Sequence, residues 1–445
     1  MVTRQAVLLI HGIGEQKPMD TLRRFVDSVW TRDTAIHHPY AGGGVWSKPD
    51  DVAESYELRR LTTPSNVANI RTDFFEFYWA HLMYGTRSGH VLAWARSLLL
   101  RNPGTVPMHL RQVYWLVIGL IAIAAGFGIF ALFSAGSAGL KLPAWISGVI
   151  SVGLLPVVRF VVRSVVGDAA RYLNAAPTNV QRRHAIRHAG ISVLKTLHTR
   201  GYERIIVVGH SLGSVIGYDI LTHAWVDYHD MATTGDEMAE LERLEEIALQ
   251  RASIPNSEVQ AAQRRYFDAL TQSGNKWRVT DFVTLGSPLA HAAILLARDA
   301  RDLARKKVDR ELLTCLPTME AVTRGGKEVY RFSFGRSDKR RVPHHAAVFA
   351  PTRWTNLYFP CRGILRGDLI GGQLGPVLGA GIRDCKVSTN QRCGFFSHTL
   401  YWAYPETAKD APPHIHALRD ALDLTDSHAA HTTGAASREI TPTSA

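Results

Sequence analysis

Short apolar runs of strand length alternate with longer stretches of helical periodicity along much of this chain. The strand-length runs, rich in β-branched or aromatic residues, are residues 5–10, 74–79, 204–209, 279–285 and 353–359. Apolar residues recur with helical spacing in residues 21–30, 181–199 and 213–223. Alternating strands and helices are typical of a parallel sheet covered by helices, so the pattern predicts an α/β protein with a mostly parallel central sheet.

The least polar part of the chain is the segment 112–163. Residues 113–133 and 144–162 contain almost no charged side chain, and a short turn ending at Lys141 separates them. Each is about as long as the roughly 20 apolar residues, ~30 Å of helix, that cross a bilayer. The pattern therefore predicts a transmembrane helical hairpin within 112–163, with a buried helical pair or a cap over an active site as the alternative.

Arginine residues flank this predicted hairpin on both sides, whereas its turn carries a single lysine. Basic flanks stay on the cytoplasmic side of a membrane, which predicts a multi-pass protein with two spans and both flanks in the cytoplasm. An even number of spans lets residues 1–111 and 164–426 join into one cytoplasmic domain, with a helical insertion at 227–276. The polar end of the chain, 427–445, is expected to be disordered.

Charge and cysteine content narrow the classes of function. The chain has 51 Lys and Arg against 39 Asp and Glu, a net charge of +12. No nucleic-acid motif accompanies this excess, so we expect no nucleic-acid partner and assign the arginines to anionic lipid. The four cysteines suggest neither a disulfide framework nor a zinc-like pair, so no metal and no other cofactor is expected. The start of the chain is expected to carry no signal peptide.

The pentapeptide Gly209-His210-Ser211-Leu212-Gly213 carries the strongest chemical signal. It fits the pattern G-x-S-x-G, and it lies between an apolar strand and a stretch of helical spacing, as a nucleophile elbow does. Its two glycines keep Cβ atoms out of a crowded turn, and the serine is left at the start of a helix. The partial positive charge there favours a developing anion. The pattern predicts Ser211 as a catalytic nucleophile.

An oxyanion hole requires two backbone N–H donors. Leu212, directly after the nucleophile, supplies one by the geometry of the turn. The loop His11-Gly12-Ile13-Gly14 follows the first predicted strand and offers the second, for which we choose Ile13; a simple tight turn is the alternative. His11 precedes the serine in the chain and is expected to shape this loop.

Nucleophile, acid and base follow in that order in this architecture, which filters the acidic residues. Asp368 follows the strand 353–359 and so lies at the carboxyl end of the sheet, the same end as the nucleophile. Asp384 is the alternative acid. Asp219 lies about two turns along the helix after the nucleophile, and Asp281 opens a strand at the opposite end of the sheet, so neither is expected to reach the site.

His398 is the histidine that fits this order as the base. It lies among aromatic residues, downstream of both candidate acids, whereas His344 and His345 precede them. His398 would take the proton of the nucleophile, and Asp368 would hold its tautomer and stabilise its charge. Ser287 lacks the strand-turn-helix context and is expected to line the site rather than to react.

Three motifs resemble a known family. His-Gly-Ile-Gly at 11–14, the segment 209–221 and the segment 282–289 look like those of α/β-hydrolase lipases. The last two are similar to intracellular DDHD-type phospholipases in particular, although the chain has no Asp-Asp-His-Asp run. The resemblance covers residues 1–15 and roughly 200–402. It implies an α/β-hydrolase fold with a mostly parallel central sheet, an acyl-serine intermediate and ester substrates.

Together these features predict a membrane-anchored serine hydrolase, a lipase or esterase, that cleaves carboxylic esters on the cytoplasmic face of a membrane. The predicted anchor favours an acyl-lipid ester as substrate. Two alternatives stay open: a catalytically silent hydrolase fold that serves as a membrane scaffold, and an acyl-thioesterase. The thioesterase would use the same Ser211, Asp368 and His398, because the chemistry of acyl transfer is shared.

Overall fold

The computed structural model describes most of the chain outside its central segment. The described residues are 2–12, 17–52, 57–83, 172, 177–231, 235–337, 340–361, 366–389, 397–408 and 410–427, with single positions between 104 and 126.

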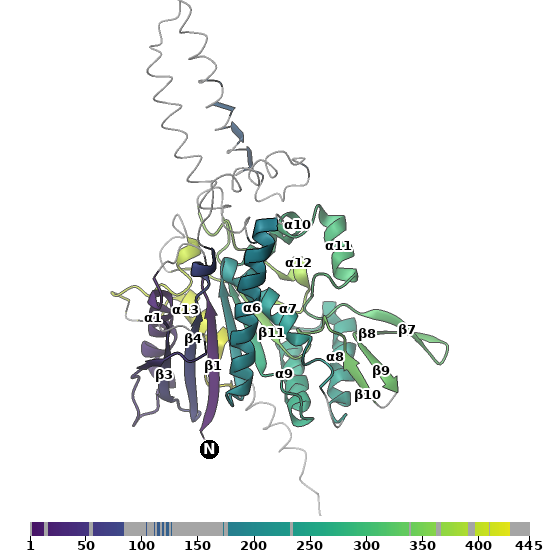
Figure 1. Cartoon of the computed structure of the whole chain (residues 1–445), viewed down its shortest axis with the longest axis horizontal. Coiled ribbons are helices and arrows are strands. Elements are labelled where there is room, and N and C mark those ends of the chain that lie inside the picture. Colours follow the sequence, from purple (N-terminus) through teal and green to yellow (C-terminus); the bar gives the residue numbers. More distant parts are fainter. Residues whose placement is uncertain are drawn as a thin grey trace, which may run out of the picture.

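An eight-stranded sheet forms the centre, in the order β12-β11-β6-β5-β1-β4-β3-β2 (Figure 1). The strands are β1 (Thr3–Ile10), β2 (Trp46–Pro49), β3 (Arg59–Ser65), β4 (Ile70–Phe77), β5 (Arg204–His210), β6 (Val279–Leu285), β11 (Arg353–Tyr358) and β12 (Arg383–Lys386). Neighbours from β12 to β4 pair in parallel, and β3 and β2 continue antiparallel at one edge. The predicted α/β protein with a mostly parallel sheet is confirmed.

Helices cover both faces of this sheet. Side chains of β1 and β5 alternate between two buried cores, with Leu8 and Val207 in one and Leu9 and Val208 in the other. The first core is closed by α6 (Pro177–Thr199), α7 (Leu212–Trp225), α8 (Met238–Leu249) and α9 (Asn256–Gln272), and the second by α1 (Asp20–Val26) and α13 (Pro413–Leu422). Burial on both faces explains why these strands are continuous apolar runs.

Several elements were not predicted from the pattern. They are β2, β3, β12, the helices α10 (Ala292–Leu295), α11 (Ala300–Val308), α12 (Gly375–Leu378) and α13, and the hairpins of β7 (Glu320–Arg324) with β8 (Lys327–Arg331) and of β9 (Ser333–Ser337) with β10 (Arg340–Pro343). The unpredicted strands are short, exposed or poor in apolar residues, so they lack the signal that a buried strand gives. The helical insertion predicted at 227–276 contains α8 and α9.

The prediction of a multi-pass membrane protein with two spans is wrong. Among the described residues, no helix is both long and apolar enough to cross a membrane. A span requires about 20 apolar residues in one continuous helix, and a run of sequence without charge does not by itself supply that helix. The cytoplasmic placement rested on the hairpin and falls with it. Most of residues 112–163, and 427–445 apart from Ser427, lie outside the described residues.

Candidate active site

Ser211 occupies the turn between β5 and α7. Its backbone has φ 53° and ψ −126°, and a positive φ is uncommon for a residue other than glycine. The Ser211 N–H donates to the carbonyl of Leu285 at the end of neighbouring β6 (2.9 Å). Strain of this kind persists where the surrounding structure enforces it, and a strand-to-helix turn that carries a strained serine is the geometry of a nucleophile elbow.

The two glycines of the pentapeptide are required by the packing of this turn. A Cβ on Gly209 would lie 2.5 Å from the Cα of Ser214, and a Cβ on Gly213 would lie 2.1 Å from the carbonyl oxygen of Ile10. Both distances are shorter than any normal contact of a Cβ atom. The sequence pattern is therefore explained by the close approach of α7 to β1 and β5.

One of the two predicted oxyanion donors is described by the structure. Leu212 is the first residue of α7, and the first N–H groups of a helix have no acceptor within the helix. Ile13 lies outside the described residues. Its neighbour Gly12 is described, and a Cβ there would lie 2.8 Å from the Cβ of Ser211. The loop after β1 therefore reaches Ser211.

His11 anchors this loop beside the site. Its ring stacks on the indole of Trp79, with ring centroids 5.3 Å apart and planes 9° from parallel. The Trp79 indole N–H donates to the His11 carbonyl (2.9 Å). These contacts agree with the expectation that His11 shapes the loop.

Asp368 and His398 lie in hydrogen-bond contact at the carboxyl end of the sheet. His398, in the short 3₁₀ helix Ser397–Thr399, donates from Nδ1 to Oδ2 of Asp368 (3.0 Å). Asp368 follows β11 and its side chain is fully buried. Residues 30 positions apart in the chain are thus brought together as an acid and base would be.

Further donors hold the Asp368 carboxylate. The Ile370 N–H donates to Oδ1 (2.8 Å), and the Tyr401 hydroxyl donates to Oδ2 (2.7 Å). Burial by itself raises the pKa of Asp368, but the proximity of His398 and hydrogen bonds from His398, the Gly371 backbone and Tyr401 outweigh it and lower the pKa to about 2. The carboxylate is therefore ionised at neutral pH and can stabilise a protonated imidazole.

Gly286, at the end of β6, is a site residue that the sequence did not reveal. It has φ +59°, and a Cβ there would lie 2.7 Å from Oδ2 of Asp368 and 3.0 Å from Nδ1 of His398. Only glycine leaves room for this pair. In the sequence, the one indication of its role was its position next to Ser287, which was expected to line the site. The Ser287 side chain is fully buried, and its hydroxyl bonds to the Ser214 hydroxyl (2.6 Å) and the Leu289 N–H (3.2 Å).

His210, the second residue of the pentapeptide, joins the turn of Ser211 to His398. Its Nε2 lies 2.9 Å from the carbonyl oxygen of His398, and the two rings are 4.9 Å apart. Because a carbonyl can only accept, Nε2 carries the proton. Burial and then the proximity of His398 lower the pKa of His210 to about 3, so its ring is neutral. In the sequence, the indication that His210 belongs to the site was its position directly before Ser211.

The other candidate acids have structural partners. Asp384 accepts hydrogen bonds from the Leu374 and Gly375 N–H groups (2.9 and 2.8 Å) at the start of α12, not from His398. Asp219 pairs with Arg187 (2.6 Å), and Asp281 is buried between two arginines. Of the two candidate acids that the sequence order left open, Asp368 is the one that contacts His398 in the described structure.

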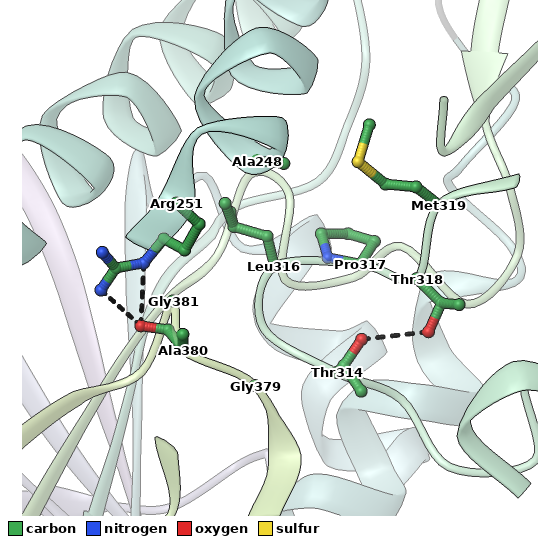
Figure 2. A pocket seen from close by; sticks show the side chains of 10 residues that line it. All are labelled: Ala248, Arg251, Thr314, Leu316, Pro317, Thr318, Met319, Gly379, Ala380 and Gly381. Carbon is green, nitrogen blue, oxygen red and sulfur yellow. Dashed lines mark hydrogen bonds between the residues drawn. The ribbon is translucent and has the colours of Figure 1, made fainter. Parts of the chain in front are cut away.

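A cavity of about 250 Å³ lies between the loop 314–319 and the residues that precede β12 (Figure 2). Its lining residues are Ala248, Arg251, Thr314, Leu316, Pro317, Thr318, Met319, Gly379, Ala380 and Gly381, none of which belongs to the site around Ser211. The Arg251 guanidinium bonds to the Ala380 carbonyl (2.9 Å), and the two threonine hydroxyls bond to each other (3.2 Å).

Within the described residues, no group of three or more His, Cys, Asp or Glu side chains is arranged to hold a metal ion.

The described part of the site therefore joins three segments: the elbow with Ser211, the loop with Asp368 and the turn with His398. Gly286 and His210 lie between them. No family model, curated protein or solved structure matches this chain.

Proposed function

We propose that this protein is a serine hydrolase with an α/β-hydrolase fold that cleaves carboxylic esters through an acyl-serine intermediate. The observation that carries the proposal is the hydrogen bond between His398 and Asp368 (3.0 Å) at the end of the sheet where the strained Ser211 lies. The His210 ring, next to Ser211, bonds to the His398 carbonyl. Nucleophile, base and acid then share one end of the sheet in the order that a serine hydrolase requires.

The first half of the reaction forms the acyl-enzyme. The Ser211 hydroxyl attacks the ester carbonyl carbon while Nε2 of His398 takes its proton. Asp368 accepts the Nδ1–H, which leaves Nε2 as the basic nitrogen, and stabilises the imidazolium. The Leu212 N–H at the start of α7 faces the developing oxyanion, with Ile13 as candidate for the second donor. Collapse of the tetrahedral intermediate expels the alcohol, which takes the proton from His398.

Hydrolysis completes the cycle. His398 removes a proton from a water molecule as it attacks the acyl carbon, and the carboxylic acid leaves as the proton returns to Ser211. The sheet, with six parallel strands and an antiparallel edge, is compatible with the proposed fold. The resemblance of the motifs to lipases favours acyl-lipid esters as the substrate class. The same steps would also cleave a thioester.

A covalent probe tests the proposal directly. Wild-type protein should react with a fluorophosphonate, mass spectrometry should map the adduct to Ser211, and p-nitrophenyl acyl esters should be hydrolysed. Ser211→Ala should lose both properties while it retains the wild-type melting temperature. Ser287→Ala removes the other motif serine and should leave the adduct on Ser211. A folded wild-type protein that neither labels nor hydrolyses esters would instead point to a catalytically silent fold.

A further inference from the structure

Tyr401 contacts the proposed acid–base pair from the buried side. Its hydroxyl donates to Oδ2 of Asp368 (2.7 Å), the same oxygen that accepts the Nδ1–H of His398 (3.0 Å). The Tyr401 side chain is fully buried, and its ring packs against that of Phe359 (centroids 4.8 Å apart). One carboxylate oxygen is therefore shared between a phenol and an imidazole.

The direction of the Tyr401 hydrogen bond is fixed by its surroundings. The backbone N–H of Phe359, just past the end of β11, donates to the Tyr401 hydroxyl oxygen (3.2 Å). A hydroxyl that receives this donor still has one proton to give, and the ionised Asp368 is an acceptor only. The chain Phe359 N–H to Tyr401 O–H to Asp368 is therefore directed towards the carboxylate, and it holds Oδ2 in place for His398.

We propose that Tyr401 is a positioning residue that sets the basicity of His398 by sharing the Asp368 oxygen to which the imidazole is bonded. The inference rests on the proposed function, in which His398 is the base. A hydrogen bond from Tyr401 draws negative charge from Oδ2, and less charge is then available to stabilise the imidazolium. Tyr401 thus limits how strongly Asp368 stabilises the protonated ring of His398.

Few other titratable groups face this pair in the described structure. His210, from the end of β5, lies 4.9 Å from the His398 ring and is neutral at ordinary pH because burial lowers its pKa to about 3. Cys361, after β11, lies close enough to Asp368 for that charge, added to burial, to raise the pKa of its thiol. Neither group carries a charge near neutral pH, so among the described residues the stabilisation of a charged His398 ring depends on Asp368 and Tyr401.

The test is the titration of His398 in the Tyr401→Phe variant. Protein labelled with ¹³C in the histidine rings is titrated by NMR, and the His398 signal is assigned from its absence in His398→Gln. We expect the pKa of His398 to rise by about half to one unit in Tyr401→Phe, the equivalent of one neutral hydrogen bond withdrawn from Oδ2. An unchanged or lowered pKa in a folded variant overturns the inference.

A matched control removes another buried tyrosine hydroxyl. Tyr218 on α7 accepts from the Leu313 N–H (2.5 Å) and donates to the Leu313 carbonyl (3.0 Å), so Tyr218→Phe also loses buried hydrogen bonds but none to Asp368. It should leave the His398 titration as in wild type. If Tyr218→Phe shifts the His398 pKa as much as Tyr401→Phe does, the effect comes from loosened packing and the inference is wrong.

Catalysis gives an independent reading. If the proposed function holds, the acidic limb of the pH profile of kcat/KM should shift to higher pH in Tyr401→Phe, by as much as the pKa measured by NMR rises. Tyr218→Phe should keep the wild-type profile. Wild-type protein without esterase activity would refute the proposed function, and the NMR titration would still decide whether Tyr401 sets the basicity of His398.

Discussion

The two ends of the central sheet each hold a buried aspartate, and the two differ in their partners. At the amino end, Asp281 lies between Arg204 (2.7 Å) and Arg353 (2.8 Å) and is 4% exposed. At the carboxyl end, Asp368 is 1% exposed and accepts from His398 and Tyr401. Burial raises the pKa of both carboxyl groups, and in both cases the partners reverse the effect and lower it.

The difference lies in whether the partner can exchange a proton. Arginine stays charged at every ordinary pH, so the ion pairs of Asp281 with Arg204 and Arg353 persist and stabilise the fold. Arg204 also donates to the carbonyls of Asp423 (2.6 Å) and Leu422 (3.0 Å), which ties the end of α13 to the sheet. Histidine gains and loses its proton near neutral pH. A buried carboxylate beside arginine thus has a structural role at Asp281, whereas the proposed function gives the one beside histidine, Asp368, a role in acid–base chemistry.

The largest expected effect is the loss of activity in Asp368→Asn. An amide keeps the shape of the side chain but removes the charge that stabilises the imidazolium and selects its tautomer, so kcat/KM for an ester should fall about ten-thousand-fold. The free energy of unfolding is measured alongside and should change much less than in the Asp281 variant below. Asp384→Asn, at the start of α12, is the control and should retain activity. Equal losses in the two variants would contradict the assignment of the acid.

At the other end of the sheet, Asp281→Asn should act on stability. It leaves two buried guanidinium groups without their charge partner, and the free energy of unfolding should drop by about 3–5 kcal/mol in a urea titration. Activity per folded molecule should stay at the wild-type level. Asp27→Asn breaks a partly exposed pair with Arg32 (2.8 Å) and should change stability much less. A stable but inactive Asp281→Asn protein would remove the contrast between the two ends.

Gly286→Ala tests how closely the catalytic end is packed. Its Cβ would press on Asp368 and His398, so the pair should shift and kcat/KM should fall about a hundredfold. Gly325 in the β7–β8 turn has nearly the same φ (+56°), with nothing near its added Cβ. Gly325→Ala should therefore show the same backbone strain, about 1–2 kcal/mol of lost stability, with full activity. Equal activity in the two variants would mean that Gly286 is needed for its φ alone.

The smallest expected effect is on the pH dependence of stability through His210. Its pKa is about 3 in the folded protein and about 6.5 in an unfolded chain. The unfolded state therefore takes up the proton first, so this contribution to stability is complete above pH 6.5 and is lost as the pH falls towards 3. By pH 5 the loss is about 2 kcal/mol. In urea titrations, His210→Asn should lose less stability between pH 7.5 and pH 5 than wild type; an identical loss would show that His210 is not held neutral.

The sequence predicted the buried strands well and the edges of the sheet poorly. Strands β5 and β6 are both fully buried, and β5 contains the continuous apolar run Ile205–Val208. Edge strand β12, Arg-Asp-Cys-Lys, has no such run and exists through its pairing with β11. The prediction of a membrane hairpin was wrong for a different reason. Its prediction rested on the absence of charge in 112–163, and composition over a long run does not determine which helix forms.

The sequence by itself determined the turn that holds Ser211, the proposed nucleophile, because the requirements of such an elbow are local. Glycines at 209 and 213 on either side of Ser211, between a strand and a helix, specify the turn within a few residues. The tertiary structure decided the partners. His398 contacts Asp368 across 30 positions and His210 across 188, and Gly286 fits beside them from a third strand. Such contacts depend on which strands lie side by side and where each one ends, and that is set by the packing of the whole sheet.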